Sequence, residues 1–204
     1  MHGYLQNGFL ALAVRIIKSA VPSLSDLSAS SVLEKLAMQR SGLILVTGPA
    51  GSGKSTTLAA MIDFINRNKS AHIVTLEDPP EYRFTEDKSI ISQRQVGSDT
   101  GSFALGLRAA LRQDPDVIMI GELRDAQTAA GAVSAAETGH LVLATLHTRS
   151  AVLAVSRMLD FFAPEKQQQM RAQLAENLQA VIAQQLVPGC HGGRTAAFEV
   201  LTFT

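Results

Sequence analysis

The stretch Gly48-Pro49-Ala50-Gly51-Ser52-Gly53-Lys54-Ser55 fits the pattern G-x-x-x-x-G-K-[ST] and lies between an apolar run at 43–47 and a helical pattern that begins at Lys54. Its glycines allow several consecutive backbone N–H groups to turn inward around a phosphate, in dihedral angles that are costly for other residues. The helix that follows directs the positive end of its dipole at the same anion. We therefore expect a phosphate-binding loop here, rather than a glycine-rich turn that binds nothing.

Two side chains of this loop add to what its backbone supplies. Lys54 is expected to bring a mobile cation to the β- and γ-phosphates of a nucleotide. The hydroxyl of Ser55 is the expected protein ligand for Mg2+. We predict that all residues of 48–55, together with Thr56, contact the nucleotide.

Short apolar runs alternate with helical periodicity on both sides of the loop, which is typical of βα units on a largely parallel sheet. The predicted strands are 43–47, 72–76, 117–120 and 141–146, with a terminal strand at 194–203. The predicted helices are 54–67, 102–112, 125–138, 150–160 and 164–185, preceded by a helix capped by Ser30 or Ser31. The sequence therefore predicts an α/β fold with a mainly parallel sheet and helices on both faces.

The composition is that of an ordinary globular protein, with 204 residues, of which 46% are hydrophobic and 18% charged. Eighteen Lys and Arg residues balance eighteen Asp and Glu residues, so no nucleic acid is expected as a partner. The single cysteine, Cys190, excludes an intramolecular disulfide and a four-cysteine zinc site. No apolar run reaches the roughly 18 residues that cross a bilayer, so we expect a cytoplasmic protein with no direct membrane insertion.

Ligands of open α/β sheets bind outside the carboxyl ends of the strands, so an acidic residue can be sorted by whether it ends or begins a strand. Glu122 follows the strand 117–120 and is expected beside the phosphates, where it serves both the hydrated Mg2+ and the attacking water. Asp116 precedes the same strand and belongs at the opposite edge of the sheet. The alternative for Glu122 is a helix N-terminal position, which also favours acids.

Glu77 and Asp78 follow the strand 72–76, and Pro79-Pro80 ends that strand so that both acids stay at the edge of the sheet. A strand that ends in its own Glu at this point is a feature of ATPases with an additional catalytic carboxylate, so Glu77 is a second catalytic candidate. The alternative is a plain turn, because Asp-Pro is a common turn signal.

The two histidines around the strand 141–146 have different expected positions. His147 follows the strand and is placed to contact a γ-phosphate. His140 begins the strand, and by position alone it is structural. A histidine beside an apolar strand is also often a core residue without a ligand, and this alternative stays open for both.

Four segments, in their order along the chain, resemble the Walker A, Asp box, Walker B and His box motifs of the secretion ATPase superfamily, whose hexameric members drive type II secretion and type IV pili. These segments are 48–55, 75–81, 111–125 and 138–148. The resemblance covers residues 12–204. The assembly and secretion members typically carry a tetracysteine zinc element that this chain lacks, so it is most similar to the retraction ATPases of type IV pili.

The resemblance implies a P-loop NTPase of the RecA-like type that uses ATP and Mg2+. It implies that Glu122 and Glu77 act on metal and water, that Lys54 and His147 take part in catalysis, and that His140 belongs with His147 to a nucleotide-sensing box. Arg15 aligns with an arginine that lies near the nucleotide between subunits.

The resemblance also implies how the chain is divided and what it serves. Residues 1–28 correspond to a remnant of an N-terminal PAS-like domain and a linker, and residues 29–204 to the motor domain. The implied assembly is a homo-hexamer that acts on a platform protein of the inner membrane and powers pilus retraction, or twitching motility. The alternatives are another type II or type IV secretion ATPase, an ATP-binding regulatory or structural module with little turnover, and a nucleic-acid motor on the same fold.

Overall fold

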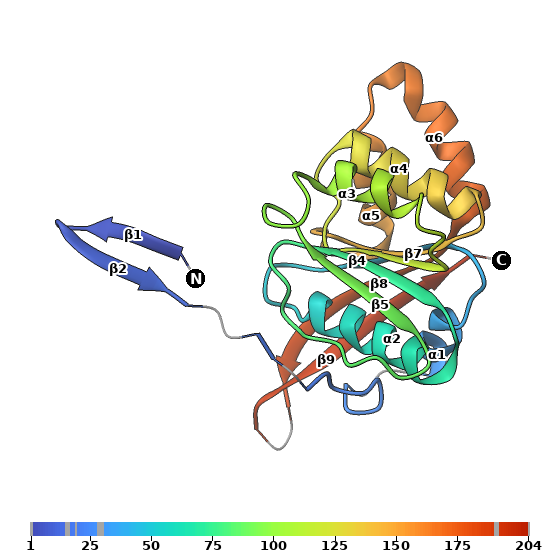
Figure 1. Cartoon of the computed structure of the whole chain (residues 1–204). Helices are drawn as coiled ribbons and strands as arrows, with labels where there is room; N and C mark the ends of the chain where they lie inside the picture. The colour runs from blue at the N-terminus through green and yellow to red at the C-terminus, as the bar shows by residue number, and fades with distance from the viewer. Residues whose placement is uncertain (1, 15–16, 19, 28–30, 190–191, 204) are drawn as a thin grey trace.

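The computed structural model describes residues 2–14, 17–18, 20–27, 31–189 and 192–203, and its main feature is a seven-stranded sheet with the order β5-β4-β6-β7-β3-β8-β9 (Figure 1). All neighbouring strands in this sheet are parallel except β8 and β9. The strands are β3 (Gly42–Thr47), β4 (His72–Glu77), β5 (Ile90–Gln95), β6 (Val117–Ile120), β7 (Leu141–Leu146), β8 (Leu178–Pro188) and β9 (Arg194–Thr202). Every strand predicted from the sequence is confirmed, and β5 and β8 are additional.

Helices cover both faces of the sheet, as predicted (Figure 1). One face packs against α1 (Ser31–Ala37) and α2 (Lys54–Asn68), and the other against α3 (Phe103–Ala110), α4 (Ala126–Glu137), α5 (Ala151–Asp160) and α6 (Pro164–Asn177). Among the described residues, no helix has both the length and the apolar character needed to cross a membrane.

Polar side chains cap three of these helices at the positions where the sequence predicts that the helices begin. Ser102, Asp125 and Ser150 each accept a hydrogen bond from a backbone N–H in the first turn of α3, α4 and α5. Of the two cap candidates for α1, Ser31 is the first residue of the helix, and Ser30 lies outside the described residues.

The prediction of one helix over 164–185 is wrong in its second half. α6 ends at Asn177, and β8 follows it directly, between β3 and β9. Val181 packs into the core on the α3–α6 side and Ile182 into the core on the α1–α2 side, which is the two-residue alternation of a strand. A run that is apolar on both faces fits a buried helix and a buried strand equally well, so its periodicity misled the prediction.

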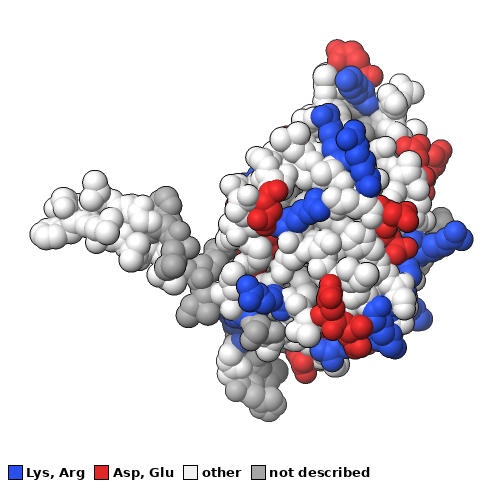
Figure 2. Space-filling model, in the orientation of Figure 1, with Lys and Arg blue, Asp and Glu red and all other residues white. Residues whose placement is uncertain are grey.

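A separate two-stranded sheet precedes the main one (Figure 1). β1 (His2–Gln6) and β2 (Phe9–Ala13) are antiparallel, and the turn between them uses Asn7 and Gly8, both with positive φ. Residues 2–14 contain no charged side chain, and this hairpin is uncharged in Figure 2. Phe9 and Leu10 are about three-quarters exposed, so the hairpin presents an apolar surface.

Candidate functional site

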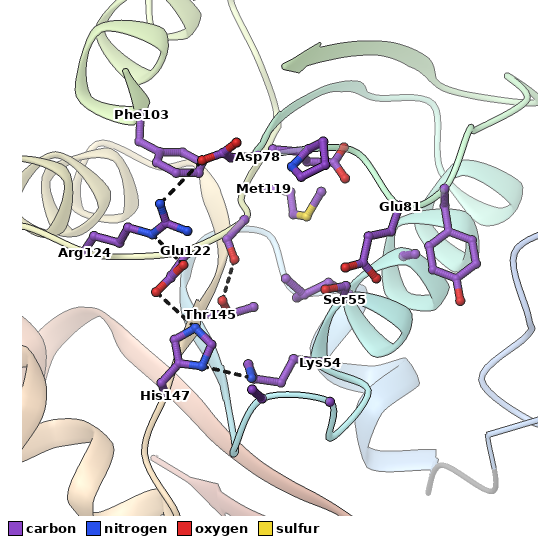
Figure 3. A pocket seen from close by; sticks show the side chains of 18 residues that line it. Lys54, Ser55, Asp78, Glu81, Phe103, Met119, Glu122, Arg124, Thr145 and His147 are labelled. Carbon is purple, nitrogen blue, oxygen red and sulfur yellow. Dashed lines mark hydrogen bonds and ion pairs between the residues drawn. The ribbon is translucent and has the colours of Figure 1, made fainter. Parts of the chain in front are cut away.

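Four parallel strands end at the same edge of the sheet because of their register. Thr47 is paired with Leu146, and Ile120 is paired with both Ala144 and Leu76. The residues at or just beyond these ends are Gly48, Glu77, Gly121, Glu122 and His147. All of them except Gly48 line a pocket of about 300 Å³, at the lower end of the volumes usual for small-molecule sites (Figure 3).

The phosphate-binding motif forms a turn between β3 and α2 that depends on its glycines. Gly48, Gly51 and Gly53 all have positive φ. A Cβ at Gly48 would lie 2.3 Å from the backbone oxygen of Gln184, so no other residue fits there. Within the described residues, the N–H groups of Gly51 and Gly53 donate to no acceptor, so these donors are available to an anion.

Ser52 adds a second sign that this loop is built for a ligand. Its side chain is 3% exposed, and its Oγ is the one buried side-chain polar atom of the described residues without a hydrogen-bond partner. Buried polar groups are normally satisfied, so an orphaned hydroxyl calls for an explanation. Together with the glycine conformations, it fits a loop that accepts a polyanion.

Lys54 is 7% exposed and is held by the loop itself. Its Nζ donates to the backbone oxygens of Gly48 at 2.9 Å and Pro49 at 3.0 Å. Burial lowers the pKa of the Lys54 amine, and the nearby carboxylates of Glu122 and Glu81 oppose that shift. The ammonium group therefore lies at the pocket wall with hydrogen bonds that phosphate oxygens can replace.

His147 joins Lys54 to Glu122 (Figure 3). Its Nδ1 lies 3.3 Å from Lys54 Nζ, and its Nε2 lies 3.0 Å from Glu122 Oε1. An ammonium group can only donate, so Nδ1 accepts and the ring carries its proton on Nε2, which donates to the carboxylate. The imidazole thus links the cation of the loop to the acid at the end of β6.

Arg124 holds the other oxygen of Glu122. Its Nε lies 2.6 Å from Glu122 Oε2, and its Nη1 lies 3.4 Å from Asp78 Oδ2. The hydrogen bond with Glu122 is the main cause that raises the pKa of the Arg124 guanidinium. The Glu122 carboxylate is therefore fixed from both sides, by Arg124 on one oxygen and by His147 on the other.

Glu77 is half-buried at the end of β4. Its Oε1 accepts hydrogen bonds from Thr75 Oγ1 and Gln93 Nε2, both at 2.8 Å. Burial raises the pKa of the Glu77 carboxyl, and the two hydrogen bonds oppose that effect. Glu77 is thus a positioned acid whose charged form is disfavoured by its surroundings.

The structure brings most, but not all, of the predicted site residues to one pocket. The predicted residues that line it are Ala50, Gly51, Lys54, Ser55, Glu77, Glu122 and His147. Thr56 does not line it, and its hydroxyl lies 3.0 Å from the hydroxyl of Tyr82, which does. Asp116 lies at the far edge, as expected, where its Oδ2 accepts from the His72 N–H.

Of the predicted residues outside the segment 48–56, His140 lies away from the pocket, and Arg15 lies outside the described residues. His140 precedes β7, at the edge of the sheet opposite the phosphate loop, and its Nδ1 lies 2.9 Å from the Ala135 backbone oxygen. The six residues of β7 lie between it and His147, which places the two about 23 Å apart, at about 3.3 Å per residue step.

Sequence reasoning assigned no role to several side chains that line or support the pocket. Arg124 stands two residues after Glu122, and Glu81 follows the Asp-Pro-Pro turn; Figure 3 shows its carboxylate directed toward Ser55. Gln93 comes from β5, which was not predicted at all. Arg124 and Glu81 lie within the motif segments given above, so the sequence could have indicated them as site residues. Gln93 lies in none of these segments.

A family described as "Type II/IV secretion system protein" matches residues 11–201, which is almost the whole chain. The chain belongs to this family. The resemblance inferred from the four motifs is thereby confirmed, and so is the RecA-like P-loop fold, because solved structures of the family have the same architecture.

Individual members of the family are similar over the full chain. YggR of Escherichia coli (strain K12), described as uncharacterized, is 51% identical over 201 residues, which are 98% of this chain and 62% of YggR. The type IV pilus retraction ATPase PilT of Pseudomonas aeruginosa is 45% identical over 204 residues, all of this chain and 59% of PilT.

A crystal structure of the pilus retraction motor PilT with bound ADP matches with a TM-score of 0.96 at 50% identity. The match covers 99% of this chain and 59% of the PilT chain. This chain thus spans about 60% of the length of these secretion system relatives.

Proposed function

We propose that this chain is the ATP-binding and ATP-hydrolysing motor domain of a type IV pilus retraction ATPase. The observation that carries the proposal is the convergence of the phosphate loop, Glu77, Glu122 and His147 on one pocket. Its similarity to PilT, which is named a retraction ATPase and was crystallised with ADP, supports the nucleotide and the motor role.

The loop and Lys54 would bind the phosphates. The free N–H groups of Gly51 and Gly53 would donate to phosphate oxygens, and Lys54 Nζ would exchange the carbonyl oxygens of Gly48 and Pro49 for β- and γ-phosphate oxygens. This exchange would be favourable, because a hydrogen bond between an ammonium group and a phosphate oxygen is stronger than one to a neutral carbonyl oxygen.

The acids would act on the attacking water. Glu122, fixed by Arg124 and His147, would orient it and accept its proton, and Glu77 would hold its other side. When the γ-phosphate binds with ATP or leaves after hydrolysis, Lys54 would move, and His147 would register that change because its Nδ1 faces Lys54. We propose this contact as the sensing role of His147.

Mg2+ fits the oxygen-rich wall of this pocket, where Ser55 and Glu122 would hold it directly or through water. When bound, it would neutralise charge on the β- and γ-phosphate oxygens.

For residues 1–28 we propose a remnant of an N-terminal domain and its linker, and for residues 29–204 the motor domain. The exposed apolar side chains of the hairpin support this division, because an isolated hairpin is only marginally stable in water. We also propose that the chain acts as a homo-hexamer in the cytoplasm, attached to the inner membrane through a platform protein, with Arg15 near the nucleotide of a neighbouring subunit.

Binding of ADP and ATP, and release of phosphate from ATP with Mg2+, test this proposal on the chain as it stands. We expect micromolar-range binding and slow turnover, since arginines supplied by other subunits contribute about 10³ to 10⁵ in rate in comparable phosphoryl-transfer systems. A chain that binds no nucleotide would overturn the proposal. Binding without any turnover would favour the regulatory or structural module instead.

A further inference from the structure

We propose that Gln184 is a positioning residue of the phosphate loop. It lies on β8, next to Ala183, which pairs with Thr47, the last residue of β3 before the loop. Its polar side chain is 2% exposed, and the three residues before it, Val181, Ile182 and Ala183, are apolar core residues. β8 therefore places one buried amide directly behind the loop. This inference rests on the proposed function, because it assumes that the loop binds phosphate.

Gln184 contacts the loop at its start and at its end. A Cβ at Gly48 would lie 2.3 Å from the Gln184 backbone oxygen, and a Cβ at Gly53 would lie 2.8 Å from Gln184 Nε2. The backbone of β8 and the side chain of Gln184 thus lie against the two glycines that bracket the turn. Close packing of this kind fixes the path of a backbone that has no side chains of its own to hold it.

Gln184 also holds the helix that the loop enters. Its Oε1 accepts a hydrogen bond from Thr57 Oγ1 at 2.7 Å, and Thr57, on the first turn of α2, is fully buried. The N–H groups of this turn are the ones that a phosphate would meet. The Thr57–Gln184 bond therefore sets where the positive end of α2 lies relative to the glycine turn.

The chemical type of this residue argues for a role beyond filling space. A buried amide costs free energy unless it is hydrogen-bonded, and an aliphatic side chain of similar size would pack behind the loop without that cost. An amide gives directional contacts that an aliphatic side chain cannot give. We infer that Gln184 sets the geometry of the loop, and through it the nucleotide affinity.

The test separates geometry from stability with paired substitutions. Gln184→Leu leaves the Thr57 hydroxyl buried without a partner, so it lowers both the unfolding temperature and the ADP affinity. The double variant Thr57→Val/Gln184→Leu removes both polar partners, which restores most of the stability. We expect ADP binding to stay weaker than wild type by at least about tenfold in the double variant, because the directional contact is still missing.

Two further variants serve as rescue and control. Thr57→Ser keeps the hydroxyl, and we expect wild-type ADP affinity. Gln168→Leu changes an exposed glutamine on α6, and we expect no change in affinity or stability. Affinity is measured by calorimetry with ADP, and stability by thermal unfolding without nucleotide.

A folded double variant with wild-type ADP affinity would overturn the positioning role. If the double variant does not fold, the comparison of Thr57→Val with Thr57→Ser decides: equal ADP affinity in those two would also overturn it. Wild-type protein that binds no ADP would instead contradict the proposed function itself.

Discussion

The two walls of the pocket are built in opposite ways. The phosphate loop is one continuous segment, 48–55, whose shape depends on backbone conformation and burial, with Lys54 only 7% exposed. The acid wall is assembled from segments after β4, β6 and β7, and two of its polar side chains reach solvent, with Arg124 54% and His147 47% exposed. The loop therefore depends on shape, and the acid wall depends on charge. Substitutions should accordingly break binding at the first wall and turnover at the second.

Lys54→Ala is expected to have the largest effect on nucleotide binding, because it removes the cation of the loop wall. Charged hydrogen bonds contribute about 1.5–3 kcal/mol each, so we expect ADP affinity to fall by at least about 100-fold. Calorimetry with ADP measures this loss. Lys35→Ala, an exposed lysine on α1, is the matched control and should bind as wild type. ADP affinity in Lys54→Ala equal to that of the control would remove Lys54 from the site.

Glu122→Gln is expected to separate nucleotide binding from turnover most clearly. It removes one charge and keeps the shape of the side chain, so ATP binding should remain while turnover falls by about 10²–10⁴-fold, as for the loss of a general base. Single-turnover phosphate release and ATP binding are measured on the same sample. Glu176→Gln, exposed on α6, controls for loss of a carboxylate. Hydrolysis at the wild-type rate would show that Glu122 is not the base.

The difference between the walls also explains which parts of the site were predictable. The loop is local, so its motif, the strand before it and the helix after it could all be read from one segment. The strand-end rule placed Glu77, Glu122 and His147 correctly at the edge of the sheet, because parallel strands all point the same way.

The parts of the site that could not be predicted depend on which strands are neighbours in the sheet. β5 is an edge strand, and its sequence Ile-Ile-Ser-Gln-Arg-Gln has no long apolar run, so Gln93 could not be connected with Glu77. β8 fits a helical pattern as well as a strand, so Gln184 could not be placed behind Gly48. Local patterns do not determine such long-range pairings.

Arg124→Gln is expected to have a smaller effect than loss of Glu122, because Arg124 acts through Glu122. Removing the 2.6 Å ion pair leaves the carboxylate held by His147 alone, and we expect turnover to fall by about tenfold with ADP affinity unchanged. Arg124→Lys should recover part of the rate. The double variant Arg124→Gln/Glu122→Gln should be no slower than Glu122→Gln, since effects through one group are not additive. An additive loss would show that Arg124 acts independently of Glu122, and Arg171→Gln on α6 controls for loss of an exposed arginine.

Glu77→Gln is expected to have the smallest effect. Unlike the other substitutions, it should raise a property of the protein, namely the stability of the fold. Burial raises the pKa of the Glu77 carboxyl above its ordinary 4.5, so the folded state binds the proton more tightly than the unfolded state does. The stability that this group contributes is therefore present below about pH 4.5 and is lost as pH rises through its raised pKa. Gln keeps the Oε1 acceptor for Thr75 and Gln93 and carries no charge. We expect Glu77→Gln to unfold at a higher temperature than wild type at pH 8, with the difference shrinking toward pH 4.5, while phosphate release falls. A stability difference that is the same at both pH values would show that the charge of Glu77 is not destabilising, and the acid wall would then be as well solvated at β4 as it is at Arg124.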